Sequence, residues 1–266
     1  MQKIIPAPGY VDPHYLDEAN IVLGSVKQRS YELMRAGEGQ TLLDLGCGIG
    51  IDTLNLAGRV GPSGRVFGVD LDPDMLAEAN RRARQAGFEG RAFHLPGDAA
   101  FLPYPGGLFD ACRSERMLIH LEEPVRAVSE LYRVLKPGGW LVLTEADWGS
   151  ASIATQQVDI ERRLARVRAE NFLRNGYAGR LLPQWMEQAG LQDITVEIVT
   201  LLWKRLADVD FLTMLDQVEA FALAGGLASQ GELEAWRAEL RRADEQGCFF
   251  SSLNIVTAAG RKATSV

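Results

Sequence analysis

The sequence predicts an α/β protein built on a doubly wound sheet of seven strands, mostly parallel with an antiparallel edge. From residue 41 to residue 146, short apolar runs alternate with helical patterns, the order expected when crossover helices join parallel strands. A glycine-rich turn, LDLGCGIG at residues 43–50, follows the first run. Two later runs, at 194–198 and 249–258, are expected to pair antiparallel at one edge of this sheet.

Local signals place the elements in order along the chain. The helix after the second strand begins at Asp72, whose carboxylate can cap free amides, with Pro73 in the first helical position, and it stops at Gly87. A later helix begins near Pro124, carries one apolar face and ends before the PGG run at 137–139. The predicted strands cover residues 41–45, 65–71, 91–95, 109–113, 140–145, 194–198 and 249–258.

The chain shows no linker that divides it, so we expect a single domain over residues 1–266. Three segments stand outside the alternating pattern. They are an amino-terminal helical cap at 1–40 and two helical inserts, at 147–180 and 206–246, all expected to lie over the site. A short helix at 183–189 follows the first insert.

Composition limits the partners. The 266 residues include 28 Lys and Arg against 35 Asp and Glu, a net charge of −7, which argues against nucleic acid and anionic membrane and favours a small-molecule partner. Three cysteines far apart in the chain indicate reduced thiols, and no signal or membrane-spanning segment is visible. We therefore expect a cytoplasmic protein; the oligomeric state is not determined by these features.

The glycine-rich turn predicts a ligand site. Gly46, Gly48 and Gly50 allow positive φ and close approach of backbone to a ligand, although a purely structural turn is the alternative. Asp70 ends the second strand 20 residues after the last glycine, about the separation at which a carboxylate meets ribose hydroxyls. The third glycine of a dinucleotide fingerprint would fall at Ile51, so pyrophosphate is the less favoured ligand.

Four motifs together resemble the class I S-adenosylmethionine-dependent methyltransferases: LDLGCGIG at 43–50, GVD at 68–70, GDAAFLPY at 97–104 and RVLKPGG at 133–139. The resemblance is to the small-molecule branch that includes the ubiquinone, menaquinone and natural-product methyltransferases, and it covers about residues 40–146. It implies a Rossmann-like fold with S-adenosyl-L-methionine as cofactor. The implied reaction is methyl transfer to an oxygen, nitrogen or carbon atom of a small organic acceptor.

The resemblance also implies roles for residues around the glycine turn. Gly46, Cys47 and Gly48 would line the methionine and ribose parts of the cofactor through backbone atoms. Asp44 would order the turn and approach the cofactor's amino group. Asp70 would accept hydrogen bonds from the ribose hydroxyls.

Further cofactor positions follow from the next strands. Leu71 and Met75 would lie against the adenine, while Asp98 would accept from the adenine amino group with Ala99 beside it. Ser114, after the fourth strand, would lie near the methionine end.

Arginines before and after the sheet offer sites for anions. Arg29 could pair with the cofactor carboxylate, although a solvated helix residue is the alternative. A cluster in the first insert could capture a phosphate or carboxylate of the acceptor, because guanidinium binds oxyanions in a fork, or could form a charged outer helix face. This cluster contains Arg162, Arg163, Arg166, Arg168, Arg174 and Arg180.

The acceptor end of the site is less specified. His120, just after the fourth strand, could act as a general base, with a structurally bonded histidine as the alternative. Tyr10, Tyr15 and Trp148 could form an aromatic wall over the acceptor. No histidine has a companion at metal-ligand spacing, so no metal is assigned.

Two other functions remain open from the sequence. A nicotinamide-dependent oxidoreductase shares the glycine turn and the acidic residue but needs the missing third glycine. A non-catalytic S-adenosylmethionine-binding module would keep the cofactor site without turnover. Cofactor titration and an acceptor screen separate these three functions.

Overall fold

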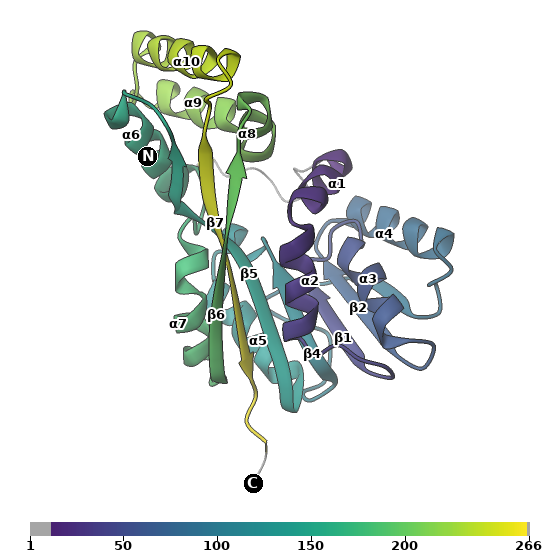
Figure 1. Cartoon of the computed structure of the whole chain (residues 1–266). Helices are drawn as coiled ribbons and strands as arrows, with labels where there is room; N and C mark the ends of the chain where they lie inside the picture. Colours follow the sequence, from purple (N-terminus) through teal and green to yellow (C-terminus); the bar gives the residue numbers. More distant parts are fainter. Residues whose placement is uncertain (1–11, 265–266) are drawn as a thin grey trace.

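The computed structural model describes residues 12–264. Seven strands form one sheet in the order β3-β2-β1-β4-β5-β7-β6, which Figure 1 shows at the centre of the molecule. The strands are β1 (Thr41–Leu45), β2 (Arg65–Asp70), β3 (Ala92–Pro96), β4 (Phe109–Glu115), β5 (Leu135–Ile153), β6 (Gln192–Trp203) and β7 (Ser251–Arg261).

Strands β1 to β5 pair in parallel, and β7 pairs antiparallel with both β5 and β6. The prediction of a mostly parallel sheet with an antiparallel edge is therefore confirmed. Because β1, β2 and β4 run in the same direction, the turns after their carboxyl ends lie at one edge of the sheet. This carboxyl edge holds the glycine turn, Asp70 and the segment that follows β4.

Helices cover both faces of the sheet. The apolar residues of α2, α3 and α4 pack on one face, and those of α5 and α7 pack on the other. In α5, for example, Val128 and Leu131 are fully buried against the sheet. The helices are α1 (Pro13–Val22), α2 (Gly24–Leu33), α3 (Ile51–Val60), α4 (Pro73–Gln85), α5 (Pro124–Val134), α6 (Val158–Val167), α7 (Ala178–Gln188), α8 (Leu206–Thr213), α9 (Leu215–Ala224) and α10 (Gln230–Glu245).

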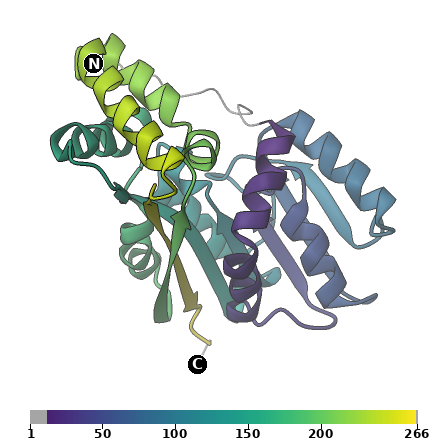
Figure 2. The ribbon, with the colours of Figure 1, turned by 45° about the horizontal axis from the view of Figure 1, so that its top comes forward.

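A second group of helices packs on the far ends of β5, β6 and β7. It consists of α6, the π-helical turn η2 (Arg168–Phe172), α8, α9 and α10, and we call it the cap lobe. Its own apolar core is centred on Trp236, which is 1% exposed. Figure 2 shows the cap lobe and α1 on the same side of the molecule, beyond the carboxyl edge of the sheet.

Several boundaries differ from the sequence prediction, and two of the differences have a clear cause in the packing. The segment 147–180 is not helical throughout, because β5 continues to Ile153 and pairs there with Ser251 of β7. The helix predicted at 183–189 begins at Ala178, with Pro183 inside it, because its first turn packs closely on β5 at Gly179. In both cases a distant strand supplies the partner that local sequence does not reveal. The cap at Asp72, by contrast, is confirmed, since its side chain accepts from the amides of Asp74 and Met75.

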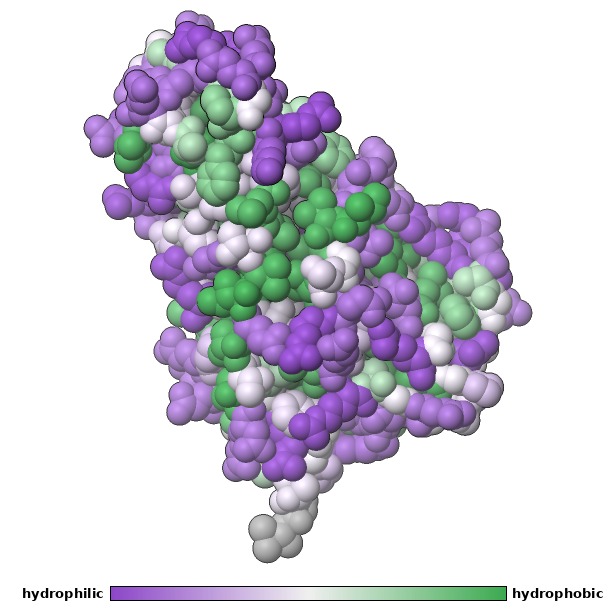
Figure 3. Space-filling view, in the orientation of Figure 1, coloured by the Kyte–Doolittle hydropathy of each residue, from purple (hydrophilic) through white to green (hydrophobic). Residues whose placement is uncertain are grey.

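Exposed apolar side chains gather where the cap lobe meets the sheet, as Figure 3 shows. The elements there carry Ile21 on α1, Leu202 on β6 and Phe211 on α8, each more than two-fifths exposed. None of the helices within residues 12–264 has the length and apolar character needed to cross a bilayer.

Candidate active site

The glycine turn between β1 and α3 needs its glycines for two reasons. Gly46, Gly48 and Gly50 have φ of 76°, 49° and 79°, in the left-handed region that residues with a Cβ rarely adopt. A Cβ at Gly46 would also lie 2.6 Å from Met117 Cγ, and one at Gly50 would lie 2.9 Å from Ala79 Cβ. The turn is thus packed tightly between the segment after β4 and helix α4.

Asp70, at the end of β2, is held beside this turn. Its Oδ2 accepts from the Gly48 amide at 2.8 Å, and its Oδ1 accepts from the Asp72 amide at 3.0 Å. A carboxylate oxygen can accept more than one hydrogen bond, so both oxygens of Asp70 can still accept from hydroxyl donors. Leu71 follows with 61% of its surface exposed, while Met75 is 9% exposed in the first turns of α4.

A buried cluster of five charged side chains lies beneath the turn. Arg113, 1% exposed, approaches Asp44 at 3.2 Å, Asp52 at 2.8 Å and Glu115 at 2.7 Å. Lys27 of α2 pairs with Asp52 and Glu115 at 2.7 and 2.6 Å. Arg116 adds a third cation at the edge of the cluster, with its Nε 3.5 Å from Glu115 Oε1, so three carboxylates are matched by three cations.

One carboxylate oxygen of Asp44 has no hydrogen-bond partner in this cluster. Its Oδ2 is buried and accepts no hydrogen bond from residues 12–264. Burial, partly offset by Arg113, raises the pKa of Asp44 to about 7. For Asp52, burial opposes ionisation, but Arg113 and Lys27 outweigh it and hold its pKa below its usual range. A donor beside Asp44 would thus find a free acceptor whose ionisation it would favour.

The other predicted cofactor residues lie along the same edge with different degrees of exposure. Asp98 is exposed after β3, and its Oδ1 accepts from the Ala100 amide at 2.8 Å; Ala99 beside it is half-buried. Cys47 is buried in the glycine turn. Ser114 is also buried, and its hydroxyl donates to Leu45 O at 2.9 Å, so this side chain joins β4 to β1 inside the sheet.

The contacts of Arg29 favour the alternative for this residue, a solvated helix residue, over a pairing with the cofactor. Its guanidinium is exposed and forms ion pairs with Glu197 of β6 at 2.7 Å and with Glu32 at 2.8 Å. Strand β6 is the edge strand farthest from β2 and β3, so these contacts direct Arg29 away from the glycine turn. Lys27, on the buried face of the same helix, is the α2 cation that reaches the site.

The segment after β4 forms a short 3-10 turn, η1 (Leu118–His120), that two distant residues hold in place. Glu145 Oε1 accepts from the Leu118 amide at 2.6 Å. Asn175 Nδ2 donates to the carbonyl oxygens of Leu118 and Leu121 at 2.9 and 2.7 Å. Sequence reasoning missed both; a glutamate within the apolar run of β5 is the signal that could have revealed Glu145.

His120 ends this turn with its side chain exposed. Its ring forms no hydrogen bond with any residue that the structure describes. Desolvation by the surrounding protein and the nearby charge of Arg116 both lower the pKa of His120. The imidazole is therefore neutral at neutral pH and can accept a proton.

Replacement of Glu145 by glutamine is expected to change how stability depends on pH. Burial raises the pKa of Glu145 from 4.5 to about 8, so the folded chain binds this proton more tightly than the unfolded chain. Its contribution to the free energy of unfolding is full below about pH 4.5 and is lost as pH rises to about 8. Since Gln cannot ionise, the Tm of Glu145→Gln relative to wild type should rise by more than about 3 °C between pH 5 and pH 8.5. The control variant Glu187→Gln, at an exposed position, should show no such trend. If the difference in Tm between Glu145→Gln and wild type does not change with pH, the raised pKa of Glu145 is contradicted.

Helix α1 connects the two sides of the carboxyl edge. Tyr15 Oη donates to Leu212 O of α8 at 3.1 Å, and Asp17 pairs with Arg82 of α4 at 2.8 Å. Leu16, between them, would lie 3.3 Å from a Cβ placed on Gly48. The helix thus passes over the glycine turn and contacts the cap lobe. Tyr10 lies outside the described residues.

The arginines of the first insert separate into two kinds. Arg162, Arg163, Arg174 and Arg180 each pair with a carboxylate, and Arg166 is exposed. Arg168 is buried instead, with its guanidinium 4.4 Å from the centre of the Trp148 ring. Trp148, the predicted aromatic wall residue, lines a small cavity in the cap lobe.

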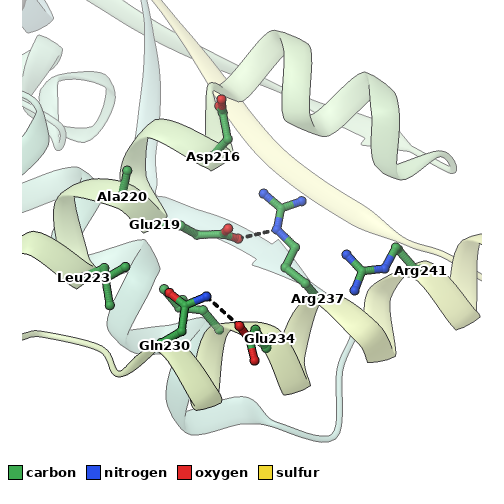
Figure 4. A pocket seen from close by; sticks show the side chains of 9 residues that line it. Asp216, Glu219, Ala220, Leu223, Gln230, Glu234, Arg237 and Arg241 are labelled. Atoms are coloured by element: carbon green, nitrogen blue, oxygen red, sulfur yellow. Dashed lines mark hydrogen bonds and ion pairs between the residues drawn. The ribbon is translucent and has the colours of Figure 1, made fainter.

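A larger hollow of about 280 Å³ lies between α9 and α10 and receives no residue from the sheet. Figure 4 shows its charged side chains, among them the pair Arg237–Glu219, whose Nε and Oε1 are 2.6 Å apart. Its lining carries three carboxylates and two arginines, and we assign it no part in the site.

The buried His94 has a structural environment. Its Nε2 lies 2.7 Å from Thr53 Oγ1 and its Nδ1 lies 3.1 Å from Asn80 Oδ1, and burial lowers its pKa to about 4. Within residues 12–264 no three metal-ligating side chains come together.

Comparison with known proteins agrees with this arrangement. The family described as a methyltransferase domain matches residues 43–143. An uncharacterised 37.1 kDa transposon protein of Streptomyces fradiae is 34% identical over 220 residues, which cover 79% of this chain and 61% of that protein. A demethylmenaquinone methyltransferase of Lactobacillus johnsonii is 34% identical over 139 residues, which cover 51% and 57%. The chain thus spans less than two thirds of the length of these relatives.

A solved structure shares the fold across nearly the whole chain. The YcgJ protein of Bacillus subtilis superimposes with a TM-score of 0.63 at 19% identity, covering 92% of this chain and 100% of that one. At this identity the likeness concerns the fold alone. The family match, however, spans the same strands and turns that form the carboxyl edge described above. Residues 43–143 of the chain therefore form a methyltransferase domain, of the kind that the resemblance to the class I S-adenosylmethionine-dependent methyltransferases implies.

Proposed function

We propose that the chain transfers a methyl group from S-adenosyl-L-methionine to an oxygen, nitrogen or carbon atom of a small organic acceptor. The observation that carries this proposal is the placement of three features at one edge of the sheet. They are the glycine turn, the Asp70 carboxylate and the buried charge cluster with its unsatisfied Asp44 oxygen.

These residues fit the methyl donor part by part. Asp44, whose buried Oδ2 has no partner in the cluster, would accept from the donor's ammonium group. Asp70 would accept from the ribose hydroxyls through oxygens already oriented by the amides of Gly48 and Asp72. The turn at Gly46, Cys47 and Gly48 would line the methionine and ribose portions through backbone atoms.

The adenine end would be formed by the turns after β2 and β3. The exposed Leu71 and the start of α4 at Met75 would lie on its faces, and Asp98 would accept from its amino group with Ala99 beside it. The buried Ser114 and Cys47 would support the donor site through backbone, since their side chains lie within the protein.

When bound, S-adenosylmethionine supplies a methyl group activated by the positive sulfonium, so no covalent enzyme intermediate is needed. The residues of the chain would align the acceptor for in-line displacement and exclude water. For an acceptor that must lose a proton, the neutral His120 would take it. Helices α1 and α2 and the two inserts would cover the acceptor, and the apolar surface near α1 and α8 supports an acceptor that is largely apolar.

Calorimetry tests the donor assignment. S-adenosylmethionine should bind and NADH should not. Loss of hydrogen bonds to a charged acceptor costs about 1.5–3 kcal/mol, so Asp70→Ala should weaken S-adenosylmethionine binding at least tenfold. Asp74→Ala, an exposed carboxylate nearby on α4, is the matched control and should bind as wild type does.

Three results would redirect the assignment. Unchanged affinity in folded Asp70→Ala would remove Asp70 from the site. Binding of NADH in preference to S-adenosylmethionine would favour an oxidoreductase. Tight S-adenosylmethionine binding with no turnover on any acceptor would favour a non-catalytic binding module.

The relatives support a small acceptor, since one is a demethylmenaquinone methyltransferase. We propose no nucleic-acid or membrane partner, because the chain carries a net charge of −7. A cytoplasmic location is proposed from the three cysteines, each a free thiol in the structure.

A further inference from the structure

A small cavity lies inside the cap lobe, where the ends of β5, β6 and β7 meet α6, η2, α8, α9 and α10. Its volume is about 40 Å³. Because one water molecule needs roughly 10–15 Å³ of such a cavity, it has room for a group of about three heavy atoms. Its apolar wall includes Ile153, Leu164, Val209 and Leu253.

Three tryptophans line this cavity with unused hydrogen-bond donors. They are Trp148, Trp203 and Trp236, and the Nε1 of each is buried without a partner among residues 12–264. Trp203 is 7% exposed and Trp236 is 1% exposed. An indole N–H can only donate, and a buried donor without an acceptor is unfavourable. The cavity therefore favours a group that accepts several hydrogen bonds.

Arg168 places a positive charge on the same cavity. It is 5% exposed, donates to the carbonyl oxygen and hydroxyl of Thr213, and stacks on Trp148. No carboxylate in the described part of the chain pairs with it. Burial lowers its pKa to about 9, so the guanidinium remains charged at neutral pH.

The one carboxylate that lines the cavity has other partners. Glu161 forms an ion pair with Arg162, and its Oε1 accepts from the Ile153 amide at 2.9 Å. It is therefore not the counter-ion of Arg168. A buried cation without a counter-ion, beside three free donors, favours an anion with several acceptor sites.

We propose that this cavity binds a carboxylate at one end of the acceptor. That the bound molecule is the methyl acceptor rests on the proposed methyl transfer. The cavity itself defines the chemical class: a largely apolar molecule with an acid group that accepts from Arg168 and the indole N–H groups.

The cavity lies farther along β5 than the carboxyl edge of the sheet. Trp148 lies four residues beyond Thr144, which pairs with Glu115 at the end of β4. Since a strand rises about 3.3 Å per residue, Trp148 lies on the order of 10 Å along β5 from the end of β4, so the acceptor would have to be long enough to span that separation.

Tryptophan fluorescence tests the cavity without methyl transfer, because three of the five tryptophans line it. Octanoate and octan-1-ol, equal in chain length, are titrated in the absence of S-adenosylmethionine. Wild type should change its emission saturably and bind octanoate at least about tenfold more tightly than octanol. Arg168→Met should lose this preference, and Arg166→Met, an exposed arginine on α6, should keep it.

A second variant covers the case in which Arg168→Met fails to fold. Trp203→Phe keeps the ring and removes the N–H, and it should weaken octanoate binding while leaving octanol binding unchanged. Equal binding of the two probes by wild type, or an intact octanoate preference in folded Arg168→Met, would overturn the proposal.

The same samples separate this proposal from the function on which it rests. If S-adenosylmethionine binds while octanoate does not, the proposed donor site stands and the cavity assignment fails. If octanoate shows the expected preference while S-adenosylmethionine does not bind, the cavity stands as an acid-binding site and the methyl transfer fails.

Discussion

Removal of residues 1–15 is expected to reduce methyl transfer to less than about one hundredth of the intact rate while most S-adenosylmethionine affinity remains. The deletion removes the hydrogen bond from Tyr15 to Leu212 that joins α1 to the cap lobe. It also removes Tyr10, which we expect to contribute to the acceptor wall. The glycine turn and Asp70 stay in place, so donor binding should survive. Turnover and calorimetry on the same preparation measure the two effects.

Point variants show whether the effect is local. Tyr15→Ala should lower turnover in the same direction as the deletion, because it removes both the hydrogen bond and the ring contact with Phe211. Ser25→Ala, at an exposed position just beyond α1, should leave turnover unchanged. Turnover of the shortened chain close to that of the intact chain would remove this segment from the acceptor site.

His120→Ala is expected to lower turnover by about 10² to 10⁴ for an acceptor whose hydroxyl or amine must lose a proton. Donor affinity should hardly change, because His120 is not among the residues assigned to the donor. The surrounding protein and Arg116 lower the pKa of His120. Wild-type turnover should therefore fall only when pH drops below the ordinary histidine range, and this acid limb should disappear in the variant.

Added imidazole offers a control for His120→Ala, since it should restore part of the rate if the lost function is proton transfer. For an acceptor that is already ionised, the same variant should retain most of its turnover. If His120→Ala keeps more than about a third of wild-type turnover on a protonated acceptor, alignment alone becomes the preferred mechanism.

The placement of the glycine turn and Asp70 at one edge of the sheet was predictable because the signals for it are local. Each strand, turn and helix from residue 41 to residue 146 is a short unit whose apolar pattern and end signals stand together in the sequence. The glycines of the turn are required by positive φ, a property of single residues. Asp70 follows directly from the end of its strand, and parallel strands bring such ends to one edge.

The choice among similar residues was not predictable in this way. Arg29 and Lys27 stand two positions apart on α2, and only the packing decides that Lys27 reaches Asp52 and Glu115, 25 and 88 residues away. Likewise, Glu145 and Asn175 hold the His120 turn from distant parts of the chain. Such contacts depend on how elements pack, which the helical and strand periods do not encode.

The sequence by itself determined the parallel part of the sheet, the glycine turn and the family, because these depend on residues that are neighbours in the chain. Only the tertiary structure decided which cations are buried and which side chains line the cavity of the cap lobe. Trp148, Trp203 and Trp236 come from three separate elements, and each is an ordinary apolar residue in its own pattern. They form one cavity with Arg168 because long-range strand pairing extends β5 and β7 into the cap lobe. Burial then leaves their N–H groups without a hydrogen-bond acceptor, which favours a ligand that can accept from them.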